Sequence, residues 1–178
     1  GLVEVAFRSV SGKGDNQNLG KIVFVIMAFM SVGGATGVFA NPTVALIPIG
    51  MVLAKTMGLD AAAGFMIIYL GAYSGFNVGW ANPSTLGVAH PIAELPVFSG
   101  MPVRFFFHGV NFVLNYLLVM KYIKGIQKDP TTSLCYQEGM KPEEYMGAQE
   151  GETFESAGKL NGKQKFCLAV MILAIVAL

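Results

Sequence analysis

Two runs of 33 residues without an Asp, Glu, Lys or Arg, residues 22–54 and 61–93, constrain the fold more than any other feature. A helix needs about 20 residues to cross the hydrocarbon core of a bilayer, so each run is too long for one straight span and too short for two. Apolar residues make up 53% of the chain and charged residues only 13%, which is unusual for a soluble domain. We therefore predict an all-α membrane protein with an irregular feature inside each run.

Lysines predict which side of the membrane each loop faces. They flank the polar stretch 125–163, and positive residues beside spans mark the cytoplasmic side. The segment around Glu94 has no Lys or Arg, so we expect it to be external. Lys21 and Lys55 bound the first run and both indicate the cytoplasmic side, so this run should enter and leave on the same side. A re-entrant helical hairpin with its tip at residues 39–43, surrounded by protein or a water-filled cavity, satisfies this requirement.

These patterns give an expected order of elements along the chain. The chain begins without Met and ends inside an apolar segment, so we expect it to be a piece of a longer protein. The expected elements are a polar N-terminal segment at 1–20, the re-entrant helical hairpin at 21–57, a broken transmembrane helix at 58–95, a transmembrane helix at 102–124, a cytoplasmic loop at 125–163 and the start of a truncated transmembrane helix at 164–178.

An Asn-Pro pair occurs in both anomalous runs, as "NPT" from Asn41 and as "NPST" from Asn82, 41 residues later. Proline frees backbone carbonyls upstream, and we expect the Asn, Ser and Thr side chains to cap the helix that restarts. Such a break presents carbonyls to a cation and N–H groups to a carboxylate, and paired broken helices indicate the binding site of a transporter. The candidate substrate- and ion-binding residues are Thr36, Asn41, Pro42, Thr43, Asn82, Pro83, Ser84 and Thr85.

Helix faces give two further signals. Glycines at four-residue steps, Gly71, Gly75 and Gly79, together with Gly33 and Gly37 in the first run, favour close packing of helices. Polar side chains at helical spacing either line the substrate path or form hydrogen bonds between helices, and Arg104 on the same face could instead reach the outer surface. The residues predicted to line a cavity are Asn77, His108, Asn111 and Asn115.

The segment 33–130 resembles a known carrier family in its glycine-rich start and in the stretches "NPST", "GVAHPIAELPVFSG" and "KDP". The resemblance is to the YfcC branch of the anaerobic four-carbon-dicarboxylate carrier (DcuC) family, in the ion transporter superfamily. It implies a secondary carrier of inverted repeats, in which a hairpin tip and a broken helix from each half enclose substrate and coupling ion. This chain would then supply the first half, and the missing C-terminal half of the same protein would be its partner.

The combined prediction is a secondary active transporter, a symporter or antiporter, in the bacterial inner membrane, where it would be a multi-pass protein. Many members of the YfcC branch carry an acidic pair where this chain has Asn41 and Pro42, so a small organic anion such as a dicarboxylate, or an amino acid, is the expected substrate. A sodium ion near Asn41 and Asn82 is the expected coupling ion, because neutral oxygens there suit sodium and both runs lack carboxylates. No other cofactor is expected, and a homodimer remains open.

Other classes of protein fit the sequence less well. A channel-type pore and a basic amino acid antiporter of the same family are the alternatives, and a saturable flux with counterflow would distinguish a carrier from a channel. An enzyme would need a nucleophile with a base or a metal cluster, whereas His90 and His108 are isolated and should be hydrogen-bonded structural residues. The net charge of +1, without a basic stripe, indicates no nucleic-acid partner.

Overall fold

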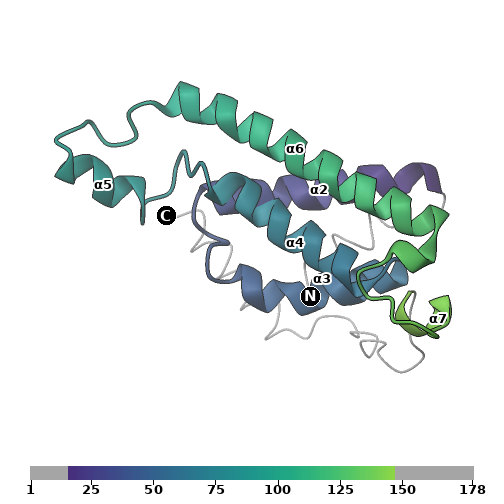
Figure 1. Cartoon of the computed structure of the whole chain (residues 1–178). Coiled ribbons are helices and arrows are strands. Elements are labelled where there is room, and N and C mark those ends of the chain that lie inside the picture. The colour runs from purple at the N-terminus through teal and green to yellow at the C-terminus, as the bar shows by residue number, and fades with distance from the viewer. Residues whose placement is uncertain (1–15, 147–178) are drawn as a thin grey trace, which may run out of the picture. The chain divides into compact units, whose positions relative to one another are not determined.

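The computed structural model describes residues 16–146, and this part of the chain is helical, with one isolated bridge between Asp60 and Met146. The predictions for residues 1–15 and 147–178, including the helix start at 164–178, lie outside the described residues. The helices, labelled in Figure 1, are α2 (Asn16–Ala35), α3 (Thr43–Thr56), α4 (Ala61–Phe76), α5 (Leu86–Ile92), α6 (Met101–Lys128), the 3-10 turn η1 (Pro130–Thr132) and α7 (Pro142–Tyr145).

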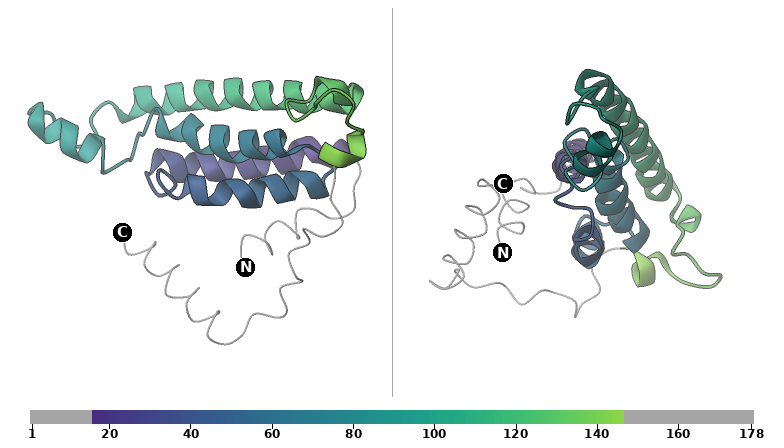
Figure 2. Two further views of the ribbon diagram at one scale, coloured as in Figure 1. Left: turned by 60° about the horizontal axis from the view of Figure 1, so that its bottom comes forward. Right: turned by 90° about the vertical axis from the view of Figure 1, so that its left-hand side faces the viewer.

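Helix α4 is the centre of the described bundle. It packs against α2, α3 and α6, whereas α2 and α3 pack mainly on α4 and not on each other. The two views of Figure 2 show α6 running along one side of α4 and α3 along another. The buried side of α4 includes Ala63, Ile67, Ile68 and Ala72, small and branched apolar residues that let neighbouring helices approach. Helix α5 lies beyond the end of this bundle (Figure 1).

Glycines allow α4 to touch its neighbours almost backbone to backbone. A Cβ on Gly75 would overlap the carbonyl of Ser31 in α2, and a Cβ on Gly34 would overlap the carbonyl of Ala72 in α4. A Cβ on Gly71 would also press on α2. The prediction that Gly71 and Gly75 serve packing is therefore confirmed. The other predicted glycines do not meet a neighbouring helix: Gly33 faces the ring of Phe39, and Gly37 and Gly79 lie against Asn82. Gly34, which the prediction did not include, meets α4.

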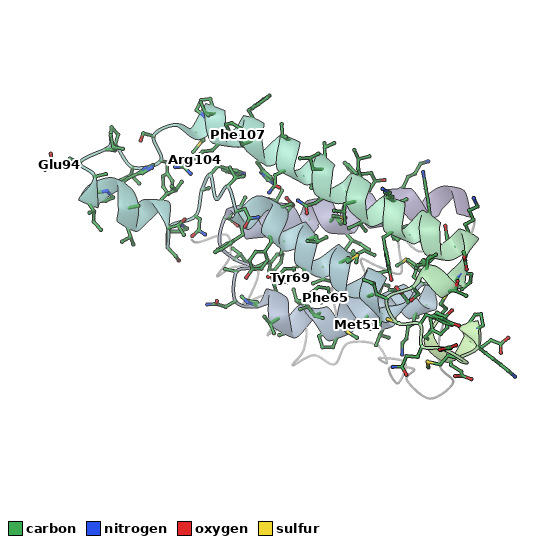
Figure 3. The ribbon with its side chains drawn as sticks, in the orientation of Figure 1. Met51, Phe65, Tyr69, Glu94, Arg104 and Phe107 are labelled. Atoms are coloured by element: carbon green, nitrogen blue, oxygen red, sulfur yellow. The ribbon has the colours of Figure 1, made fainter. Side chains whose placement is uncertain are left out.

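Helix α6 is the one described helix that is long and apolar enough to cross a membrane by length and composition. It has 28 residues, and shorter apolar helices occupy Leu19–Ala35, Thr43–Thr56 and Ala61–Phe76. Its outer face carries bare apolar side chains: Phe106 is 68% exposed and Leu114 is 60% exposed. Figure 3 shows Phe107 pointing away from the bundle. A helical bundle with such a face, as residues 16–146 form, is consistent with a membrane protein.

At the opposite end of the bundle from α5, the buried carboxylate of Asp60 joins three segments. Its Oδ1 accepts a hydrogen bond from Ala63 N at 2.7 Å and so caps α4. Its Oδ2 accepts from the hydroxyls of Tyr122 in α6 and Ser133 in the following loop, each at 2.5 Å. Three donors compensate the buried charge, so this cluster fixes the start of α4 against the end of α6.

The "KDP" stretch forms the end of α6. Asp129 Oδ1 accepts hydrogen bonds from Thr131 N at 3.0 Å and from the Thr131 hydroxyl at 2.6 Å. These bonds cap η1 and lower the pKa of the exposed Asp129 carboxyl. This part of the resemblance to the carrier family therefore has a structural role.

Candidate functional site

Both Asn-Pro stretches lie in non-helical segments, and these segments meet. We call residues 36–42, between α2 and α3, the turn, and residues 77–85, between α4 and α5, the break. Ala81 N in the break donates to Ala35 O, just before the turn, at 3.4 Å. Gly37 in the turn has φ +82°, and a Cβ there would be 2.8 Å from Oδ1 of Asn82. Glycine is therefore required both for the backbone conformation and for the approach of the Asn82 side chain.

Asn82 is fully buried in the break, with a relative exposure of 0%. Its Oδ1 accepts a hydrogen bond from Ser84 N at 2.9 Å, which fixes the orientation of the amide. Its Nδ2 is one of three buried side-chain atoms in residues 16–146 without a hydrogen-bond partner, with His90 Nδ1 and Tyr145 OH. An unsatisfied buried donor costs about 1–3 kcal/mol, so this N–H is a candidate donor for an acceptor that the described residues do not supply.

The candidates of the first stretch have a different environment. Asn41 and Pro42 are exposed, whereas Thr43 is buried and its hydroxyl donates to the carbonyl of Phe39. The hydroxyl of Thr36 is 3.1 Å from the carbonyl of Gly33 and 3.2 Å from that of Val32, both within its own helix end. Both threonine hydroxyls thus have acceptors in the nearby backbone.

The expectation that Asn, Ser or Thr side chains cap the restarting helices is wrong. The residue before α3 is Pro42 and the residue before α5 is Thr85, and neither provides a side-chain cap. The Thr43 hydroxyl turns back to Phe39, and Asn82 instead accepts from Ser84 N within the break. Pro83, Ser84 and Thr85 are exposed beside buried Asn82.

The predicted cavity-lining residues of α6 contact neighbouring helices. His108 Nδ1 accepts from Trp80 Nε1 at 2.7 Å, and His108 Nε2 is 2.6 Å from Ser31 Oγ in α2. Asn111 Nδ2 donates to the Ser74 carbonyl in α4 at 2.8 Å. These contacts are the hydrogen bonds between helices that the sequence offered as an alternative to a substrate path.

Of the remaining polar candidates, Asn115 and Asn77 make no hydrogen bond to another helix within residues 16–146, whereas Arg104 bonds to the break. Asn115 Nδ2 donates to Asn111 O one turn earlier at 2.8 Å, and Asn77 is exposed at the start of the break. Arg104 Nη1 donates to the carbonyl of Val78 in the break at 3.2 Å. Figure 3 shows Arg104 near the start of α6, with Glu94 at the far tip of the preceding loop. Arg104 thus joins α6 to the break.

Sequence reasoning missed Ser31, Ser74 and Trp80. The hydroxyls of Ser31 and Ser74 are 2.8 Å apart between α2 and α4, and both serines are buried. A serine at the centre of an apolar run is a weak signal, because many such residues bond only to their own helix. Trp80, the one tryptophan of the sequence, lies two residues before Asn82. Its position beside the predicted binding residues was the signal that could have identified it.

The expectation for the two histidines is met in one case. Both ring nitrogens of His108 have partners, as expected for a structural histidine. His90 in α5 is also buried, but its Nδ1 has no partner among the described residues. Within residues 16–146 no three His, Cys, Asp or Glu side chains gather as a metal site.

Comparison with known proteins identifies the family. The chain matches the C4-dicarboxylate anaerobic carrier family, DcuC, over residues 4–178. It is 28% identical over 119 residues to the Escherichia coli (strain K12) protein named "Putative basic amino acid antiporter YfcC", a match that covers 66% of this chain and 24% of that protein. The match thus spans about a quarter of the length of that relative. No solved structure matches the chain. The family match extends over nearly the whole sequence, and the chain therefore belongs to the DcuC family of C4-dicarboxylate carriers.

Proposed function

We propose that this chain is part of a secondary active carrier for a small organic anion, and that the break binds a carboxylate of the substrate. The family consists of carriers, which supports transport in general. The observation that carries the proposal is the buried Nδ2 of Asn82, a donor whose partner is not among the described residues. A carboxylate is the acceptor that gains most from such a donor, because hydrogen bonds to charged groups are worth about 1.5–3 kcal/mol.

The electrostatics of the break support an anion over a cation. Residues 61–93 contain no Asp or Glu, so no described side chain in this run would repel a carboxylate. Arg104 extends to the carbonyl of Val78 and adds a positive charge beside the break. A positive guanidinium near a buried N–H donor favours negative charge at that point.

The proposal includes the larger architecture expected from the sequence. The turn 36–42 would be the tip of a re-entrant hairpin, and the break would interrupt a transmembrane helix. Their contact through Gly37 and Asn82 supports the view that the two segments form one site. A second, inverted half would complete the enclosure around Asn41, Pro42 and Thr43. The carrier would be a multi-pass protein of the bacterial inner membrane.

Sodium remains the proposed coupling ion. Because no metal-like cluster of acidic, His or Cys side chains occurs in residues 16–146, an ion here would use neutral oxygens. Asn82 Oδ1 has one lone pair left after accepting from Ser84 N, and the exposed amide of Asn41 offers a second oxygen. Sodium bound there would offset the charge of an anionic substrate. These residues fit a weakly held, hard cation such as sodium.

A basic amino acid is the competing substrate. The relative in Escherichia coli is named as an antiporter of basic amino acids, and an amino acid also carries a carboxylate that Asn82 could bind. The two substrates differ in their cationic group, for which the break and the turn provide no acidic side chain. The charge of the site therefore favours the dicarboxylate.

Transport by the full-length carrier in proteoliposomes tests the proposal. Saturable uptake and counterflow of succinate are expected, with arginine as the competing substrate. Asn82→Asp keeps the shape of the side chain, removes the N–H donor and adds a negative charge. It should weaken succinate transport more than Asn82→Ala does, because the added charge repels the substrate. Stronger transport of arginine than of succinate, or a flux that neither saturates nor shows counterflow, would contradict the proposal.

A further inference from the structure

A chain of hydrogen bonds joins the break to α6, α2 and α4 through the ring of His108. Trp80 Nε1 donates to His108 Nδ1 at 2.7 Å, and His108 Nε2 is 2.6 Å from Ser31 Oγ. Ser31 Oγ is 2.8 Å from Ser74 Oγ, which is 2.7 Å from the carbonyl of Gly71. Five groups from four segments of the chain thus form one continuous path.

The chemistry of the donors assigns the protons along this path. An indole N–H only donates, so His108 Nδ1 must be an acceptor and the ring must be neutral. The ring proton then lies on Nε2 and is donated to Ser31. The one hydroxyl proton of Ser74 can be donated to the Gly71 carbonyl or to Ser31, which has two lone pairs and can also accept from His108. Every donor has an acceptor when His108 is neutral.

Protonation of His108 would break this pattern at one place. A protonated ring carries N–H on both nitrogens, so Nδ1–H would face the indole N–H of Trp80 and the bond between them would be lost. The bond from Nε2 to Ser31 would remain. The release therefore acts on Trp80, which is two residues from Asn82 in the break.

The charged and titratable groups around His108 offer no compensation for a positive ring. Residues 22–35 of α2 and residues 77–85 of the break contain none, and α4 contributes only Tyr69 and Tyr73. On α6 itself, Arg104 lies one turn before His108 and is positive. A second positive charge beside Arg104 is unfavourable. The lack of a nearby negative group and the presence of Arg104 therefore both favour the neutral ring, which accepts the hydrogen bond from Trp80.

We propose that His108 is a positioning residue that holds the break in place when neutral and releases Trp80 when protonated. Its consequence for transport rests on the proposed role of Asn82 in substrate binding. Trp80 and Asn82 share the same short segment, so release of Trp80 should loosen the position of the amide donor. The carrier should then bind its substrate more weakly at low pH.

Fluorescence of Trp80 tests the release without any need for transport. Trp80 is the one tryptophan of this sequence, and the signal that disappears in Trp80→Phe defines its contribution in the full-length carrier. We expect this signal to change with the uptake of a single proton as the pH is lowered into the acid range. His108→Gln is the matched control, because its amide can accept from Trp80 and donate to Ser31 but does not titrate. A titration that persists in His108→Gln, or no titration in the wild type, would overturn the proposal.

Transport kinetics supply a second test that does not depend on the folding of His108→Gln. Trp80→Phe lacks the indole donor, so at neutral pH it should behave as the wild type does at low pH. Its half-saturating succinate concentration should be raised about threefold to tenfold, the effect of one lost hydrogen bond. A value equal to that of the wild type at neutral pH would contradict the positioning role. If no form of the carrier transports succinate, the proposed function fails, while the fluorescence titration still decides the proposal for His108.

Discussion

The turn at residues 36–42 and the break at residues 77–85 contain the same Asn-Pro pair in opposite environments. Asn41 is exposed, whereas Asn82 is fully buried and its side-chain oxygen Oδ1 accepts a hydrogen bond from Ser84 N. The proline is exposed in both segments. The motif therefore marks where a helix stops, and the packing around it decides whether its amide becomes a fixed donor.

Helix α6 also contacts the two segments unequally. Helix α6 passes beside the break and contributes Arg104 to Val78 O and His108 to Trp80. No hydrogen bond from α6 to the turn occurs within the described residues, and what reaches the turn is the break itself, through Asn82 at Gly37. The comparison teaches that one of two similar segments is preorganised by its neighbours, and preorganised donors bind ligands more strongly.

The largest effect is expected from a substitution that forces α2 and α4 apart, because the packing of these two helices brings the turn and the break together. Gly75→Leu would drive a side chain into the backbone of Ser31, where even a Cβ overlaps the carbonyl. We expect a loss of about 3 kcal/mol of stability, the upper end of the cost of overpacking, seen as little folded protein or a much lower melting temperature in detergent. Gly109→Leu in α6 is the matched control, because a Cβ there meets no atom within 4 Å. Equal stability of the two variants would contradict the close packing of α2 on α4.

The next effect compares the two asparagines directly. Asn82→Ala should raise the half-saturating succinate concentration about tenfold or more, since it removes a hydrogen bond to a charged group. Asn41→Ala should change this concentration less, because Asn41 is exposed and no neighbour holds its amide in place. Initial uptake rates at equal amounts of folded carrier provide the measurement. A larger effect at Asn41 than at Asn82 would reverse the comparison.

A smaller effect is expected from loosening the hold of α6 on the break. Arg104→Met removes the donor to the Val78 carbonyl at 3.2 Å but keeps a long side chain. The half-saturating concentration should rise by about twofold to tenfold, the value of one partly buried hydrogen bond. Arg104→Lys keeps a positive donor and should restore part of the loss. Identical kinetics of Arg104→Met and the wild type would show that this contact does not position the break.

The smallest effect is expected in the turn. The hydroxyl of Thr36 bonds to carbonyls of its own helix end, so Thr36→Val removes a local contact and leaves the branched shape. Its stability and half-saturating concentration should stay close to the wild type, within about 0.5 kcal/mol or twofold. A strong loss of transport with normal folding would place Thr36 among the substrate-binding residues after all.

The sequence predicted local features better than long-range contacts. Apolar composition indicated a helical protein, and the four-residue spacing of Gly71 and Gly75 predicted close helix packing, because both signals reside in neighbouring residues. The capping expectation failed because the Thr43 hydroxyl can reach Phe39 O as easily as the next helix turn. Asp60 lies directly before the second run, where an Asp is a typical cap, and it does cap α4.

Contacts across the bundle could not be derived from spacing alone. Tyr122 and Ser133 lie 62 and 73 residues from Asp60, and Ser31 lies 77 residues from His108. Which of many polar side chains meet depends on how α2, α4 and α6 rotate against one another. The burial of Asn82, the most informative feature of the site, depends on the same packing and was equally invisible in the sequence.

Protection of the break by substrate is the most direct test of the central claim that a substrate carboxylate binds there. Ser84→Cys, in full-length carrier lacking Cys135 and Cys167, places a thiol beside Asn82, and Glu94→Cys places one in the exposed loop before α6 as a control. Saturating succinate should slow alkylation at position 84 and leave the rate at position 94 unchanged. Equal alkylation rates at position 84 with and without succinate, and with and without arginine, in carrier that transports either compound would contradict the claim.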